Sequence, residues 1–150
     1  MKTLTIRHLT LGSGQPKIAV PLVARDEAAL SAALKNLEHA CFDIIEFRAD
    51  YFDQAGNPEY LLAQAEAVRR AFPETPLLFT FRRAEEGGEY PCSKAYYFEL
   101  LDKAAASGII DIIDIELSAG ESEVRQVVAA AKAHDSAVLM SNHDFHQTPA

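Results

Sequence analysis

The chain has 150 residues, of which 49% are hydrophobic and 24% are charged, and its formal net charge is −8 with an isoelectric point near 5.0. This composition is typical of one globular domain with a hydrophobic core, and the acidic excess argues against a nucleic-acid or anionic-membrane partner. No apolar run approaches the roughly 18 residues of a membrane span, and MKTLTIRHLT lacks the apolar stretch of a signal peptide. We therefore expect a cytoplasmic protein that acts on a small molecule.

Strand-like and helix-like segments alternate along the chain. TLTIRHLTLGSG predicts two short strands around a turn, a hairpin that closes the bottom of a sheet. Five strands are predicted to start near residues 18, 43, 77, 111 and 137. Four helices are predicted between them: 27–40 capped by Asp26, 58–72 capped by Asn57, a third capped by Ser93 and stopped by Gly108, and 121–134. This order demands parallel strands joined by right-handed crossovers.

Each strand-like segment has one apolar face and one face that turns polar toward its C-terminal end. Successive side chains of a strand point to opposite faces, so the polar residues share one side of the sheet. These residues are Glu46, Arg48, Asp50, Thr80, Arg82, Asp114, Glu116, Ser141 and His143. Such a face predicts an active-site mouth.

Two folds fit this order of elements. A five-stranded doubly wound sheet would carry helices on both faces, and its central strands would then be apolar on both. An (β/α)8 barrel explains the polar strand ends better, although such barrels need about 250 residues. We therefore expect residues 1–150 to form a single domain, an incomplete TIM barrel of about five βα units plus the N-terminal hairpin. Thr148, Pro149 and Ala150 predict the cap and first turn of another helix.

His143 is the best candidate for proton transfer, because imidazole titrates near neutral pH and this histidine follows a strand end. Arg82 is a natural bidentate partner for a substrate carboxylate. Asp114 and Glu116 are expected to orient the arginines rather than react, since buried charges need partners.

Two further interpretations concern the loop after Arg82 and the second histidine. The adjacent Gly87 and Gly88 would let this loop move over a ligand. His143 and His146, with nearby carboxylates, also fit metal ligation, although two arginines on the same face would repel a dication. Cys41 and Cys92 lack a CxxC spacing, which argues against a disulfide framework or a zinc site.

The segments EFRAD, FTFRRAEEGG and SNHDFHQTP occur in this order, and with them the whole chain resembles the type I 3-dehydroquinate dehydratases of the shikimate pathway. The resemblance implies an (β/α)8 barrel, commonly a homodimer, that needs no metal or organic cofactor. It implies a lyase that converts 3-dehydroquinate to 3-dehydroshikimate through a Schiff base between a lysine and the ring ketone. His143 would be the general acid/base, and Glu46, Arg48 and Arg82 would bind the substrate. Glu86 would lie in a loop near the bound ring, and Pro21 replaces a serine of some close relatives.

The lysine of the Schiff base lies beyond the SNHDF segment in this family. The lysines of this chain are Lys2, Lys17, Lys35, Lys94, Lys103 and Lys132, and none is predicted at the C-terminal end of a strand. The 150 residues are therefore expected to be inactive alone. Three interpretations stay open: a portion of the dehydratase, a non-catalytic half-barrel that binds ligand or partner chains, and a metal-dependent barrel isomerase.

Overall fold

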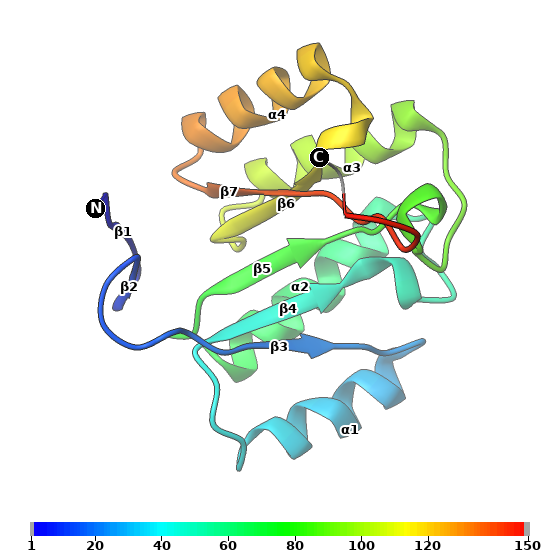
Figure 1. Ribbon diagram of the computed structural model, residues 1–150. Coiled ribbons are helices and arrows are strands. Elements are labelled where there is room, and N and C mark those ends of the chain that lie inside the picture. Colours follow the sequence, from blue (N-terminus) through cyan, green and yellow to red (C-terminus); the bar gives the residue numbers. More distant parts are fainter. Residues whose placement is uncertain (1, 149–150) are drawn as a thin grey trace.

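Five parallel strands form one sheet in the computed structural model, which describes residues 2–148 (Figure 1). Each strand pairs with the strand that follows it in the chain, so the spatial order is β3-β4-β5-β6-β7. The strands are β3 (Ala19–Leu22), β4 (Ile44–Arg48), β5 (Leu77–Thr80), β6 (Ile112–Glu116) and β7 (Ala137–Ser141). The predicted parallel sheet is confirmed. Pro21, which has no amide hydrogen to donate, lies in the edge strand β3, where proline is tolerated.

One helix joins each pair of neighbouring strands. The helices are α1 (Glu27–Leu37), α2 (Pro58–Ala71), α3 (Lys94–Ala106) and α4 (Glu121–Ala133). The three predicted side-chain caps are confirmed: Asp26, Asn57 and Ser93 each accept a hydrogen bond from the amide three residues later, at 2.8, 3.1 and 3.1 Å. Gly108 has φ +70° just after α3, as the predicted stop requires.

Helix α1 is shorter than predicted. It ends at Leu37 instead of Ala40, because the amides of Glu38 and Ala40 bond to carbonyl groups three residues back. This tighter hydrogen-bond spacing ends the α-helix, although the side chains of Leu34 and Leu37 still pack against the core.

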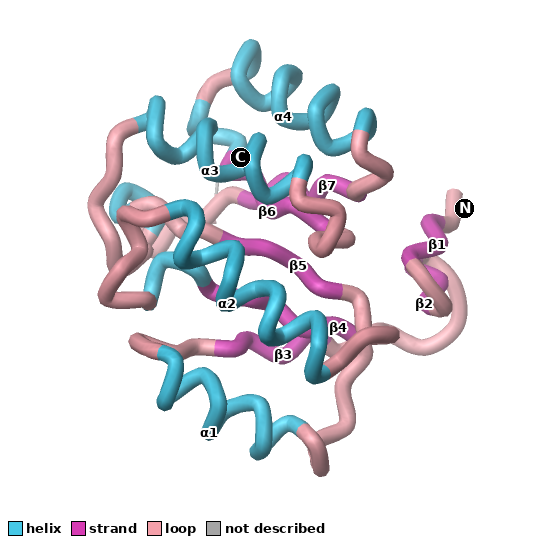
Figure 2. The backbone as a smooth tube through the Cα atoms, turned by 180° about the vertical axis from the view of Figure 1, so that it is seen from behind, coloured by secondary structure: helices cyan, strands magenta, loops and turns pink. Residues whose placement is uncertain are grey.

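All four helices lie on the same face of the sheet (Figures 1 and 2). We call this the outer face. Phe47, Phe79 and Ile113 project from it and are fully buried in a hydrophobic core with the helices. A doubly wound sheet would carry helices on both faces, so this alternative does not describe the structure. The chain has an α/β fold with a parallel sheet covered on one side.

The opposite, inner face is closed at the N-terminal ends of its strands. Strands β1 (Leu4–Ile6) and β2 (Leu9–Leu11) pair antiparallel as the predicted hairpin, which lies at that end of the sheet (Figure 1). The apolar floor, as we call this contact, consists of Ile6, Leu9, Ile44, Leu78 and Ile112, which form a second buried cluster. Below the floor, Arg7 of the hairpin donates a hydrogen bond to Asp111 at 2.8 Å.

Strands β4 and β5 end earlier than predicted at their polar ends. β4 stops at Arg48 and β5 at Thr80, so Asp50 and Arg82 lie just past the strands, and Asp50 falls in a short 3₁₀ turn over Ala49–Tyr51. The Asp50 carboxylate accepts a hydrogen bond from the backbone amide of Arg82 at 3.3 Å. β7 ends at Ser141, so His143 follows the end of a strand, as predicted.

Two further observations complete the fold. Within residues 2–148, no helix is long and apolar enough to cross a membrane. Thr148 was predicted to cap a further helix. The first turn of that helix would include Pro149 and Ala150, which lie outside the described residues.

Candidate active site

The inner face becomes polar one layer above the floor. Glu46 is level with Leu78, and the next residues along the same face are Arg48 and Thr80, which pair in register. Asp114 is level with Leu139, and Glu116 is level with Ser141. The C-terminal ends of the strands therefore bring together the polar side chains that strand parity predicts to share a face.

Arg82 lies at the centre of this polar mouth, and its side chain is only 8% exposed. Its Nη2 donates to both Asp114 oxygens, at 2.9 and 3.0 Å, and its Nη1 donates to Glu116 at 3.1 Å and to Ser141 Oγ at 2.9 Å. The prediction that Asp114 and Glu116 orient an arginine agrees with these contacts. Both terminal nitrogens of Arg82 are thus engaged by this chain's own oxygens.

A second arginine, Arg83, was not predicted as part of the site. Its Nε donates to Glu116 at 2.5 Å, and its amide donates to the other Glu116 oxygen at 2.8 Å. Glu116 is completely buried, so its charge is balanced by the two arginines that it holds. The Arg83 guanidinium also lies 5.5 Å from the centre of the Tyr97 ring.

Arg48 has a different environment. Asp50 holds it from one side, with Nε and Nη2 donating to the two carboxylate oxygens at 2.9 and 3.0 Å. Its Nη1 donates to no group within residues 2–148, and its side chain is 18% exposed. Asp50 is itself buried and accepts the amide of Glu89 at 3.2 Å, which ties the loop after β5 to the Arg48 pair.

Glu46 is half-buried on the inner face, and in the described part of the chain its carboxylate accepts no hydrogen bond and forms no ion pair. The carboxylate is therefore free to accept a hydrogen bond from a ligand.

His143 and Glu86 contact each other, a pairing that the sequence did not predict. The Nδ1 atom of His143 is 2.9 Å from Glu86 Oε2, and the backbone amide of His143 donates to the same oxygen at 3.0 Å. Glu86 is 5% exposed whereas the His143 side chain is 38% exposed, so the pair joins a buried carboxylate to an accessible imidazole. The two residues line an open cavity of about 340 Å³ with Ser118 and Asn142.

The charge state of Glu86 follows from its partners. Burial alone would raise the pKa of Glu86, but hydrogen bonds from Ser118 and His143 and the positive charge of Arg82 together lower it below its ordinary value. An ionised carboxylate only accepts hydrogen bonds, so His143 Nδ1 must carry the proton that faces it. The other ring nitrogen, Nε2, is then left unprotonated in the neutral ring and can act as a base.

The loop that carries Glu86 is closely attached to the strand ends. Gly87 adopts φ +84° at the end of a 3₁₀ turn over Ala84–Glu86, and the Gly88 amide bonds to the Arg83 carbonyl at 2.9 Å. A Cβ atom at Gly88 would lie 1.8 Å from the Arg82 carbonyl oxygen, so only glycine fits there. In this structure the glycine pair fixes the position of Glu86; whether the loop also moves over a ligand stays a prediction.

Two other groups of residues were considered in the sequence, the second histidine and the lysines. In residues 2–148 no three histidine, cysteine, aspartate or glutamate residues are grouped so as to hold a metal ion, and His146 is exposed. The six lysines precede β1 and β3 or lie on α1, α3 and α4, so none is at the C-terminal end of a strand.

Comparison with known proteins assigns the family. Residues 18–150 match the family model for type I 3-dehydroquinase. The chain belongs to the type I 3-dehydroquinase family. A 3-dehydroquinate dehydratase from Neisseria gonorrhoeae (strain NCCP11945) is 54% identical over 147 residues, which are 98% of this chain and 58% of that protein. A 3-dehydroquinate dehydratase from Escherichia coli O7:K1 is 48% identical over 149 residues, 99% of this chain and 59% of its own length.

Solved structures agree with this assignment. A type I 3-dehydroquinate dehydratase from Clostridium difficile superposes with a TM-score of 0.95 at 36% identity, covering 99% of this chain and 58% of that one. The 3-dehydroquinate dehydratase from Enterococcus faecalis gives a TM-score of 0.92 at 31% identity, covering 98% and 61%. The chain therefore spans somewhat more than half the length of these relatives and has the fold of that portion.

Proposed function

We propose that this chain supplies the acid/base and carboxylate-binding part of a type I 3-dehydroquinate dehydratase, a cytoplasmic lyase that converts 3-dehydroquinate to 3-dehydroshikimate. The observation that carries the proposal is the Glu86–His143 pair, which joins a buried carboxylate to an accessible imidazole at the polar mouth. As the resemblance noted above implies, the reaction requires no organic cofactor or metal. Dimerisation of the complete enzyme is part of the same proposal.

The chemistry of the reaction suits His143. The substrate must lose a proton from the carbon next to its ring ketone, and the carbanion that results is unstable. A Schiff base on the ketone provides an electron sink, so a base of moderate strength is sufficient. His143 Nε2 takes this proton, and the charged imidazole that forms is stabilised by Glu86. The same imidazolium then returns a proton to the departing hydroxyl group.

The two arginines are assigned different tasks. Arg48 keeps Nη1 available, so it binds the substrate carboxylate directly, while Asp50 fixes the guanidinium plane. Arg82, whose terminal nitrogens are already bonded, contributes mainly its positive charge and the placement of neighbouring side chains. Glu46, which has no partner among the described residues, accepts a hydrogen bond from a substrate hydroxyl.

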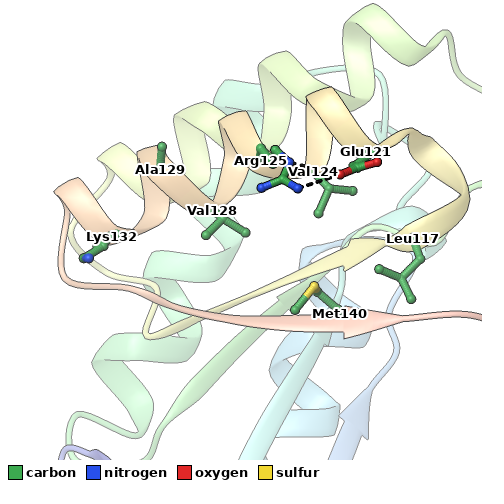
Figure 3. A pocket seen from close by; sticks show the side chains of 8 residues that line it. All are labelled: Leu117, Glu121, Val124, Arg125, Val128, Ala129, Lys132 and Met140. Atoms are coloured by element: carbon green, nitrogen blue, oxygen red, sulfur yellow. Dashed lines mark hydrogen bonds and ion pairs between the residues drawn. The ribbon is translucent and has the colours of Figure 1, made fainter.

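The fold supports the further proposal that residues 1–150 are one domain and form part of an (β/α)8 barrel. An apolar groove lies between α4 and β7, and its lining includes Val124, Val128, Leu117 and Met140 (Figure 3). Met140 is 56% exposed on the outer face and Leu139 is 47% exposed on the inner face. A further βα unit beside β7 would bury both faces, as each of the earlier units does for its neighbour.

The Schiff-base lysine is assigned to the part of the dehydratase outside these 150 residues. None of the six lysines lies at the C-terminal end of a strand, and Lys94, at the start of α3, donates to the Ala119 carbonyl at 3.2 Å. The relatives extend over a further two fifths of their length.

The experiment that tests the proposal is complementation. The 150-residue chain is mixed with a separate polypeptide that carries the last three βα units of the gonococcal relative, and formation of the conjugated enone product is followed by absorbance. We refer to this assembly as the complemented chain. Dehydration of 3-dehydroquinate by the mixture, and by neither polypeptide alone, is the expected result. If the two polypeptides assemble, as judged by size-exclusion chromatography, but give no product, the proposed function is wrong.

A further inference from the structure

The hydroxyl of Ser118 lies between two buried charged side chains. Ser118 belongs to a 3₁₀ turn over Leu117–Ala119 that follows β6, and its Oγ is 2.8 Å from Arg83 Nη2 and 2.5 Å from Glu86 Oε1. The serine itself is exposed, whereas the side chains of Arg83 and Glu86 are 4% and 5% exposed. A single exposed hydroxyl thus joins the buried ionic cluster to the carboxylate that contacts His143.

The direction of each hydrogen bond in this chain of contacts is fixed. An arginine can only donate, so Arg83 occupies a lone pair of the Ser118 oxygen. The single proton of the serine must then point toward Glu86, which as a carboxylate can only accept. The remaining Glu86 oxygen accepts from the amide of His143 and faces its Nδ1. Arg83 therefore donates to Ser118, Ser118 donates to Glu86, and His143 donates to Glu86 from the other side, so the hydrogen bonds converge on this carboxylate.

Arg83, from which these hydrogen bonds begin, is held firmly in place. Arg83 is held by Glu116 through both its amide and its Nε, and its guanidinium packs on the Tyr97 ring. Glu116 is completely buried, and its own amide donates to the Tyr97 hydroxyl at 3.1 Å. Arg82 also lies near Glu86, but its Nη1 is 3.9 Å from Glu86 Oε2, beyond hydrogen-bond reach. Within the described residues, Ser118 is the group that bonds Oε1.

We propose that Ser118 is a positioning residue for the reaction, which fixes the Glu86 carboxylate so that His143 presents one tautomer to the substrate. Without the serine hydroxyl, Oε1 would lose its hydrogen bond and the carboxylate could rotate away from Nδ1. The imidazole would then be free to exchange tautomers, and Nε2 would be the base for only part of the time. This role rests on the function proposed above, because it assumes that His143 exchanges a proton with the substrate.

The test compares Ser118→Ala with Ser118→Thr, which keeps a hydroxyl, and with Ser122→Ala as a matched control. Ser122 is also exposed and also donates to a glutamate, Glu123, at 2.5 Å, but it lies on α4 and its side chain bonds none of Arg83, Glu86 and His143. Because Ser118 and Ser122 are both exposed, neither substitution removes a core side chain. Circular dichroism checks that all three variants keep the helix content of the parent.

Two NMR measurements test the position of Glu86 without requiring catalysis. In the 150-residue chain, ¹⁵N shifts of the His143 ring report the tautomer, and ¹³C shifts report the titration of Glu86. For Ser118→Ala we expect a mixed tautomer and a Glu86 pKa that rises, by roughly half a unit to one unit, because a donor to the charged form is removed. Ser118→Thr and Ser122→Ala should match the parent. An unchanged tautomer and an unchanged Glu86 titration in Ser118→Ala would overturn the proposal.

The kinetic readout uses the complemented chain. Ser118→Ala should lower kcat on the order of ten-fold with little change in KM, the lower end of what partners of a catalytic ligand contribute. Ser118→Thr should restore most of the rate. Equal kcat for Ser118→Ala and Ser122→Ala would also overturn the positioning role. Absence of turnover by the parent would instead contradict the proposed function, while the resonance readouts would still decide the position of Glu86.

Discussion

The two ends of the inner face show how one sheet separates stability from chemistry. At the N-terminal ends of the strands, the apolar floor packs Leu78 and its neighbours against the hairpin, with no charge in the cluster. At the C-terminal ends, Arg82, Asp114 and Glu116 are as buried as the floor but are joined by hydrogen bonds. The floor contributes hydrophobic burial, whereas the mouth contributes oriented charge whose net effect on stability is small, because desolvation offsets the ionic attraction.

Among the substitutions at the two ends of the inner face, replacement of His143 is expected to have the largest effect, and this effect is on catalysis. In the complemented chain, His143→Ala should slow dehydration by a factor of about 10² to 10⁴, the usual contribution of a positioned acid/base. Substrate binding, measured by titration calorimetry, should largely persist, because the arginines are unchanged. His39→Ala is the matched control, since His39 is exposed, follows α1, and its side chain makes no hydrogen bond in the described residues. Near-normal turnover by His143→Ala would remove this residue from the acid/base role.

The second largest effect is expected for a substitution in the apolar floor, which should lower the stability of the fold without a direct effect on catalysis. Leu78→Ala should lower the free energy of unfolding by about 2 to 5 kcal/mol, because it leaves a cavity beneath the mouth. Leu139→Ala, on the same face but 47% exposed, should cost less than about 1 kcal/mol in the 150-residue chain. Urea unfolding followed by circular dichroism measures both. Equal losses for the two variants would mean that the floor is not a packed core.

The two arginines provide a third way to sharpen the comparison. Arg82→Lys loses the planar fork that bonds Asp114 and Glu116, so we expect a loss of about 2 kcal/mol in stability. Arg48→Lys should cost less than about 1 kcal/mol in stability, since Arg48 has one carboxylate partner, but should weaken substrate binding about ten-fold. Denaturant unfolding and calorimetry on the complemented chain separate the two quantities. The reverse pattern, with Arg82 governing affinity alone, would restore Arg82 as the direct carboxylate ligand.

The smallest effect is a pH dependence at Glu86. Its pKa in the folded chain lies below its ordinary value of 4.5, so its ionised form contributes stability above pH 4.5. This contribution is lost as the pH falls through the lower folded pKa. Glu86→Gln should therefore be less stable than the parent at neutral pH, with the difference shrinking in acid. A difference that grows in acid would contradict the depressed pKa.

Much of the fold could be predicted from the sequence, because hydrophobic periodicity and caps are local signals. Asp26, Asn57 and Ser93 mark helix starts that the structure confirms. The alternation of Glu46 and Arg48 and of Asp114 and Glu116 correctly predicts which side chains share a face. The ends of β4 and β5 were predicted too late, at Asp50 and Arg82, where the Asp50 carboxylate accepts the backbone amide of Arg82.

The contacts of the site were harder to predict. Arg83 and Ser118 became part of it only because the turns after β5 and β6 meet in space, and no periodic pattern signals a meeting of two turns. The Glu86–His143 contact joins residues 57 positions apart in the sequence. A local signal did exist at Gly88, where the close backbone approach that only glycine allows fixes the turn that carries Glu86.

The central claim is that this chain carries the acid/base and carboxylate-binding groups of the dehydratase while the nucleophilic lysine comes from the rest of the barrel. Borohydride trapping with 3-dehydroquinate tests it directly, because reduction of a Schiff base leaves a permanent increase in mass on the polypeptide that formed it. In the complemented chain, mass spectrometry should find the adduct on the added polypeptide and none on the six lysines of the 150-residue chain. An adduct on the 150-residue chain alone, accompanied by measurable dehydration, would contradict the claim.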